Sequence, residues 1–131
     1  MKVIKQTVDF RASPHEVYEA LMDQKKHSEF TGSPARISRN IGGNFSAYGG
    51  GIHGRNIELV PDRRIVQDWH CETEGWPEGH LSRVEFVLEK SAGGTLLRFT
   101  QSRVPDKAYE DIRDGWEEYY WKPMKAMFKG K

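Results

Sequence analysis

The chain has 131 residues, a length that suits one domain and leaves no room for two. Twenty lysine and arginine residues stand against nineteen aspartate and glutamate residues, which gives a formal net charge of +1. This balance indicates neither a nucleic-acid-binding protein nor a protein bound to anionic membranes. The single cysteine excludes an internal disulfide, and no apolar run approaches the ~18 residues that cross a bilayer. We therefore expect a single domain over residues 1–131, located in the cytoplasm.

The N-terminal part predicts one strand and two short helices. Residues 3–10 alternate apolar and polar side chains, as a half-buried strand does. Ser13-Pro14-His15-Glu16 has the spacing of a capping box with proline at the first helical position, which predicts a helix over residues 14–22. A second short helix is expected over residues 24–31, ending at Gly32-Ser33-Pro34 because the residue before a proline avoids the helical region.

The middle of the chain predicts a sheet. Residues 35–103 hold most of the thirteen glycines, which separate short runs rich in Ile, Val, Leu, Phe and Trp. We expect five or six antiparallel strands there, of which residues 64–71, 81–89 and 95–101 show the clearest alternation. One curved antiparallel meander accounts for all of them.

The C-terminal part predicts one long helix over residues 106–127. At 100° per residue, seven side chains fall in one apolar stripe that we expect to face the sheet: Tyr109, Ile112, Trp116, Tyr119, Tyr120, Pro123 and Met127. Pro123 lacks a backbone N–H and is expected to kink the last turn.

Trp121 lies outside this stripe. It is about 140° from Trp116 on a regular helix, on a second flank close to Phe128. Two interpretations are open. The first helix or the N-terminal strand covers the flank as part of the core, or the flank is an exposed apolar surface on which a partner docks.

No pattern in the chain anchors an enzymatic reaction, a cofactor or a metal. Gly49–Gly54 matches G-x-G-x-x-G, but a strand rather than a helix is expected after it, so we interpret it as a tight turn. His53, His70, Cys71 and His80 are the residues that could gather round an ion. His70 and Cys71 are adjacent in a strand and point to opposite faces, so we expect no metal site. Cys71 is expected to be a small buried side chain and not a reactive thiol.

Several short motifs, in this order, resemble a known family. They include Gly42-Gly43-Asn44-Phe45, Trp76-Pro77-Glu78-Gly79-His80 and Gly115-Trp116-Glu117-Glu118-Tyr119-Tyr120-Trp121. Together they are similar to the C-terminal domain of the activator of heat shock protein 90 ATPase, a member of the START-like (SRPBCC) helix-grip superfamily. The resemblance implies an α+β helix-grip fold: a curved antiparallel sheet wrapped around a long C-terminal helix, with two short helices after the first strand. We expect the separate N-terminal domain of two-domain members to be missing, since the first strand begins at Val3.

The resemblance leaves two functions open. The first is a co-chaperone-like module, not an enzyme, that binds a heat shock protein 90-type chaperone and stimulates its ATPase. The candidate partner-binding residues are Trp76, His80, Trp121 and Phe128. The second is a carrier or sensor of a small hydrophobic ligand held between sheet and helix. The candidate ligand-binding residues are Phe45, Trp69, Phe86, Phe99, Trp116 and Tyr120, although the same aromatic side chains could simply fill a core.

Overall fold

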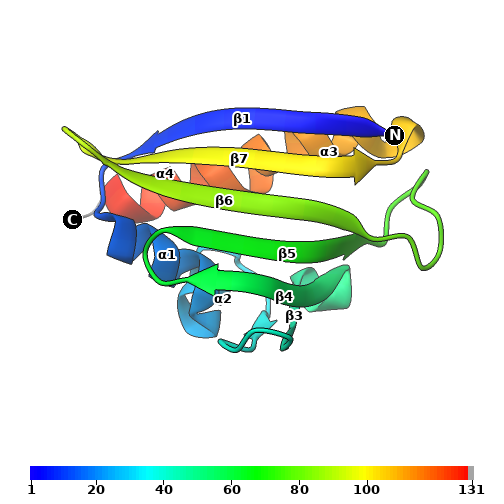
Figure 1. Ribbon diagram of the computed structural model, residues 1–131, viewed down its shortest axis with the longest axis horizontal. Coiled ribbons are helices and arrows are strands. Elements are labelled where there is room, and N and C mark those ends of the chain that lie inside the picture. Colours follow the sequence, from blue (N-terminus) through cyan, green and yellow to red (C-terminus); the bar gives the residue numbers. More distant parts are fainter. Residues whose placement is uncertain (130–131) are drawn as a thin grey trace.

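A computed structural model describes residues 1–129 and shows an α+β helix-grip fold (Figure 1). Its seven-stranded antiparallel sheet has the order β1-β7-β6-β5-β4-β3-β2. The strands are β1 (Lys2–Phe10), β2 (Arg36–Ile37), β3 (Asn44–Ala47), β4 (Ile52–Val60), β5 (Arg64–Cys71), β6 (Ser82–Ser91) and β7 (Gly94–Val104). Six of them follow the two short helices, so the expected number of strands is confirmed.

The two short helices follow β1 as expected: α1 (Pro14–Met22) and α2 (Gln24–Thr31). The capping box is present, because the Ser13 side chain accepts a bond from the Glu16 N–H and the Glu16 carboxylate accepts one from the Ser13 N–H, both at 3.2 Å. Gly32, in the left-handed conformation at φ +70°, ends α2. Across the described residues, no helix has the length and apolar character needed to cross a membrane.

The C-terminal segment is not the regular helix that the sequence predicted. A short 3₁₀ turn (Asp106–Ala108) leads into α3 (Tyr109–Trp116), and α4 (Lys122–Lys129) ends the segment. Between α3 and α4 lies a single π-helical turn (Glu117–Trp121), in which backbone bonds join residues five apart. We call this segment the π turn. The irregularity lies before Pro123 and not in the last turn, where we expected a kink.

Side chains from other segments of the chain satisfy backbone groups around the π turn. In a regular helix the N–H of residue 123 would donate to the Tyr119 carbonyl, but proline has no N–H. The hydroxyl of Tyr48 donates to that carbonyl at 3.0 Å instead. On the other side, the Gln6 amide donates to the Arg113 carbonyl at 3.2 Å.

The π turn shifts the buried face of the helix by one residue. Before it, Ile112 and Trp116 are buried as predicted. After it, Met124 and Phe128 are buried in place of the predicted Pro123 and Met127, which are half-buried. Tyr119, predicted to face the sheet, is 56% exposed.

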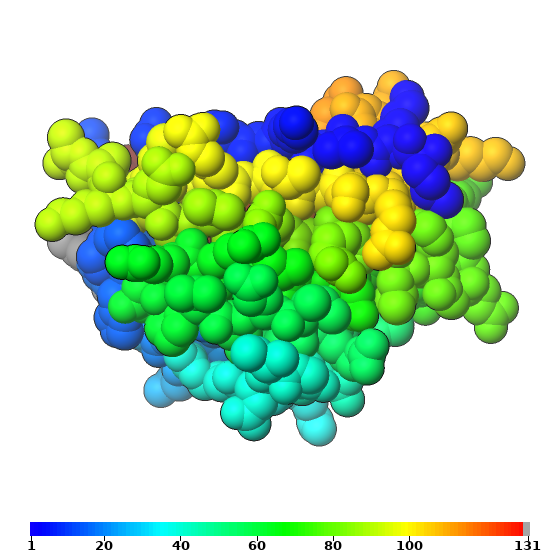
Figure 2. Space-filling model, viewed as in Figure 1, coloured from blue at the N-terminus to red at the C-terminus, as the bar shows by residue number. Residues whose placement is uncertain are grey.

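All helices lie on one face of the sheet, and the core lies between them and the strands (Figure 1). Figure 2 shows the opposite, outer face, where bands of colour follow the strands from β1 in blue through β7 in yellow to β4 in green. No described helix covers this outer face.

Candidate functional site

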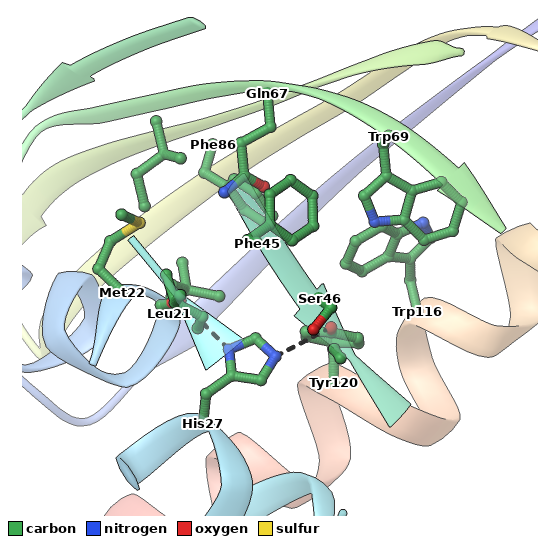
Figure 3. Close-up of a pocket in the computed structure, with 13 residues that line it drawn as sticks. Leu21, Met22, His27, Phe45, Ser46, Gln67, Trp69, Phe86, Trp116 and Tyr120 are labelled. Carbon is green, nitrogen blue, oxygen red and sulfur yellow. Dashed lines mark hydrogen bonds between the residues drawn. The ribbon is translucent and has the colours of Figure 1, made fainter. Parts of the chain in front are cut away.

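The six candidate ligand-binding residues form a packed core. Each is less than 9% exposed. The Trp116 ring is central: its centroid lies 4.4 Å from that of Phe99, 4.7 Å from Tyr120 and 5.5 Å from Trp69. The enclosed cavity that most of these residues line has a volume of about 20 Å³ (Figure 3), which is room for about one water molecule. A hydrophobic ligand has no enclosed space among these side chains.

Trp121 and Phe128 also belong to the core, so the exposed-flank interpretation is wrong. Trp121 is 1% exposed and stacks on Trp116, with ring centroids 5.5 Å apart and planes 22° apart. Phe10 of β1 contacts both Trp121 and Phe128 edge to face. The N-terminal strand thus covers the flank. The physical reason is the π turn, which fits five residues into about one turn and so brings Trp121 back over Trp116.

Trp76 and His80 close the loop between β5 and β6. Trp76 is buried and packs against Trp69, and its indole N–H donates to the His80 carbonyl at 2.9 Å. The His80 ring donates from Nε2 to the Arg103 carbonyl at 2.8 Å. Both candidate partner-binding residues therefore make contacts inside the chain that hold this loop against β7.

A buried chain of hydrogen bonds joins the helix to the sheet. The Trp116 indole N–H donates to Gln101 Oε1 at 2.8 Å, and the Gln101 amide donates to Ser82 Oγ at 3.0 Å. The Ser82 hydroxyl donates to the Trp69 carbonyl at 3.0 Å. Gln101 and Ser82 are both 0% exposed, so this network fixes where the Trp116 ring sits. The alternation along β7 places Gln101 on the same face as Leu97 and Phe99. This pattern was the sequence signal from which the burial of Gln101 could have been predicted.

His27 of α2 reaches the same core and is held neutral there. Its Nδ1 lies 3.2 Å from the Leu21 carbonyl, which can only accept, so Nδ1 carries the proton. Nε2 then accepts from the Tyr120 hydroxyl at 3.0 Å (Figure 3). Burial lowers the pKa of His27 to about 4 and raises the pKa of Tyr120.

The buried neutral His27 is expected to make stability fall in mild acid. Its pKa is about 4 in the folded chain against 6.5 for the ordinary residue, so the unfolded chain binds the proton first as pH falls. The stabilising contribution is present above pH 6.5 and is lost toward pH 4, amounting to at most about 3 kcal/mol at 1.36 kcal/mol per pKa unit. Urea unfolding across this pH range should show a shallower pH dependence for His27→Gln than for the unchanged chain. The exposed His15→Gln variant is the control and should keep the full dependence; equal slopes for both variants would contradict the assignment.

A large hollow lies beside this core, between the ends of β4 and β5 and the C-terminal helix. This groove has a volume of about 740 Å³. Trp69 and Trp116 form part of its apolar lining, and Tyr119 lines it next to Tyr48, with ring centroids 5.8 Å apart. Cys71 also faces the groove, and burial followed by the charge of Glu72 raises the pKa of its thiol to about 11. The Cys71 thiol is therefore neutral near neutral pH, but the side chain is half-buried and not fully buried as expected.

The rim of the groove is acidic. Its ionisable lining residues besides tyrosine and Cys71 are Glu72, Asp111, Asp114 and Glu118, and none of the lysine and arginine residues within 1–129 lines it. Sequence reasoning missed this rim. The signal was available in the spacing of three and four residues from Asp111 to Asp114 and Glu118, which places them on one helix face.

The sequence matches a known family over most of its length. The family described as "Activator of Hsp90 ATPase homolog 1-like protein" matches residues 11–129. The chain is 32% identical over 119 residues to "Activator of 90 kDa heat shock protein ATPase homolog 1" of Homo sapiens, a match that covers 91% of this chain and 35% of that protein. The chain thus spans about a third of the length of this curated relative.

Solved structures share the fold. An HSP90 activator from Plasmodium falciparum superposes with a TM-score of 0.88 at 21% identity, covering 97% of this chain and 96% of that one. The Aha1 dimer from Colwellia psychrerythraea superposes with a TM-score of 0.81 at 20% identity, covering 100% and 99%. On the family match and the shared fold, the chain belongs to the family of activator of Hsp90 ATPase homolog 1-like proteins.

Proposed function

We propose that this chain binds a heat shock protein 90-type chaperone and stimulates its ATP hydrolysis, acting by contact and not by a reaction of its own. The observation that carries the proposal is the family match over residues 11–129. The chain corresponds to about a third of the curated human relative, so the proposal concerns what this domain does by itself. A lone domain of this size offers one modest interface, and we expect a Kd in the micromolar range or weaker.

The groove is the surface that we propose for this contact. Trp121 and Phe128 are buried and offer no surface to a partner. The groove instead combines an exposed aromatic ring, Tyr119, with an acidic rim. An aromatic anchor inside a charged rim favours a basic segment of the chaperone that carries an apolar side chain.

The test is the ATPase rate of the chaperone, titrated with this chain and with rim variants. Asp111→Lys combined with Glu118→Lys reverses the rim charge and is expected to weaken binding more than about tenfold, with a matching loss of stimulation. Glu110→Lys is the matched control, because Glu110 is an exposed acid of the same helix that does not line the groove. It should leave binding and rate within about twofold. Circular dichroism checks that both variants are folded.

Two results would contradict the proposal. The first is no change in the ATPase rate and no NMR shift at high concentrations of the unchanged chain, which would remove the chaperone as a partner. The second is equal loss with Glu110→Lys and the rim variant, which would remove the groove as the contact surface. A carrier of a hydrophobic ligand would use an open groove such as this one and not the interior cavity, which has a volume of only about 20 Å³.

A further inference from the structure

A group of metal-ligand side chains meets on the outer face of the sheet, at the ends of β4 and β5. His53 of β4 and His70 of β5 are directly paired across the strands, and their ring centroids are 4.8 Å apart. Glu72 follows β5, and its Oε1 lies 2.9 Å from His70 Nε2 and 4.0 Å from His53 Nε2. One ligand atom from each of the three residues lies within 4.8 Å of the others.

The hydrogen bonds of His70 leave one lone pair aimed at a carboxylate. Its Nδ1 is 2.9 Å from the His80 carbonyl, and a carbonyl only accepts, so Nδ1 carries a proton. In the neutral ring Nε2 is then unprotonated, yet it lies 2.9 Å from the Glu72 carboxylate oxygen. Two acceptors at this distance need a proton or a metal cation between them. The two candidates are a second proton on His70 and a cation shared by both atoms.

The contacts around His70 are those of an ordered metal ligand and not those of a mobile surface side chain. His70 is 4% exposed. The His80 carbonyl that holds its Nδ1 also accepts from the Trp76 indole, and the His80 ring is bonded to the Arg103 carbonyl. These contacts fix the ring orientation, with Nε2 beside the Glu72 carboxylate, as supporting groups do for histidines that bind metals.

We propose that His53, His70 and Glu72 form a binding site for a divalent transition-metal ion of the zinc class. Two imidazole nitrogens and one carboxylate are a ligand set that Zn²⁺ uses when one position stays open. Zinc lies about 2.1 Å from such ligands, so two ligand atoms of one tetrahedral ion are about 3.4 Å apart. The Glu72 oxygen lies 2.9 Å from His70 Nε2 and 4.0 Å from His53 Nε2, and all ligand atoms of the set lie within 4.8 Å of one another, so the set closes round an ion with a movement of up to about 1.4 Å.

The two ligands that have to move are the exposed ones. The side chains of His53 and Glu72 are 48% and 68% exposed, so the ion has access from solvent and the third ligand, His70, stays in place. Cys71 takes no part, because adjacent residues of a strand point to opposite faces of the sheet and Cys71 follows His70 directly in β5. Three protein ligands leave at least one position for water or for a group from another molecule.

The experiment is titration of the metal-free chain with Zn²⁺ by isothermal calorimetry at neutral pH, repeated with Co²⁺ to read the coordination geometry from its absorption spectrum. One ion per chain should bind and raise the Tm. His53→Gln and Glu72→Gln should each raise the Kd more than about tenfold. His15→Gln and Glu74→Gln replace exposed residues outside the cluster and should leave the Kd unchanged. His70 is left intact in all variants because it also holds the loop at His80.

NMR of the histidine ring nitrogens distinguishes a metal ion bound at His70 from a second proton on the His70 ring. Zinc binding should shift Nε2 of His53 and of His70 while Nδ1 of His70 stays protonated. The proposal fails if zinc does not bind, or if His53→Gln and Glu72→Gln bind it as tightly as the unchanged chain. It also fails if both nitrogens of His70 are protonated and excess zinc leaves their signals unmoved, since the cluster is then an ion pair alone.

Discussion

Replacing Trp121 by alanine is expected to destabilise the chain by about 3–5 kcal/mol, as much as Trp116→Ala, which is the usual range for emptying a buried aromatic site. Trp121 is 1% exposed, stacks on Trp116 and donates its indole N–H to Gln6 Oε1 at 2.7 Å. A loss of this size is a large share of the 5–15 kcal/mol that stabilises a typical domain. Urea unfolding followed by circular dichroism measures it.

A double-mutant cycle sharpens this test. Because the two rings are in contact, the double variant should differ from the sum of the single losses by about 0.5–3 kcal/mol. Tyr119→Ala is the control from the same turn, since this ring is 56% exposed, and it should lose no more than about 1 kcal/mol. A loss for Trp121→Ala no larger than that of Tyr119→Ala would show that the flank is not core.

Gln101→Leu is expected to destabilise the chain by about 1–3 kcal/mol although leucine is similar in size and more apolar. The change leaves the buried Trp116 indole N–H without its acceptor, while the Ser82 hydroxyl loses the Gln101 amide as a donor but still donates to the Trp69 carbonyl. Each buried polar group left unpaired costs about 1–3 kcal/mol. The free energy of unfolding in urea is again the measurement.

The control for Gln101→Leu is Thr100→Val, the preceding residue of β7, which points to the opposite face of the sheet. It should change stability by less than about 0.5 kcal/mol. The double variant Gln101→Leu with Ser82→Ala should lose less than the two single losses added together, because both remove the same bond. Full additivity would mean that the buried network is not coupled.

Local signals were sufficient to predict most of the fold. The capping box at Ser13 and the alternation in β5, β6 and β7 act over a few residues, and the structure keeps them. The π turn could not be predicted in this way. A hydrophobic stripe assumes one fixed angle per residue, and one extra residue in one turn moves every later side chain by about one position. For this reason Trp121 was placed on the wrong flank and Met127 was expected where Phe128 lies.

Contacts between distant segments of the candidate sites could not be predicted from local sequence patterns either. The aromatic residues of the core were recognisable as a group, but whether they enclose a cavity depends on packing that no short motif records. His53 and His70 lie far apart in the sequence, and only the pairing of β4 with β5 brings them side by side. Glu72 lies beside the two histidines because it directly follows the last residue of β5. Without the register of the two strands, His70 and Cys71 were the natural pair to consider.

The pairing of β1 has a consequence for how the chain folds while a ribosome makes it. Strand β1 leaves the exit tunnel first, yet its one strand partner is β7, with Phe10 opposite Thr95 and Lys2 opposite Val104. Residues up to β7 must emerge before β1 can dock, and the aromatic residues of the C-terminal helix emerge later still. Such long-range closure slows folding, and β1 has no strand partner until β7 has left the tunnel. The first strand of this sheet is therefore among the last of its strands to pair.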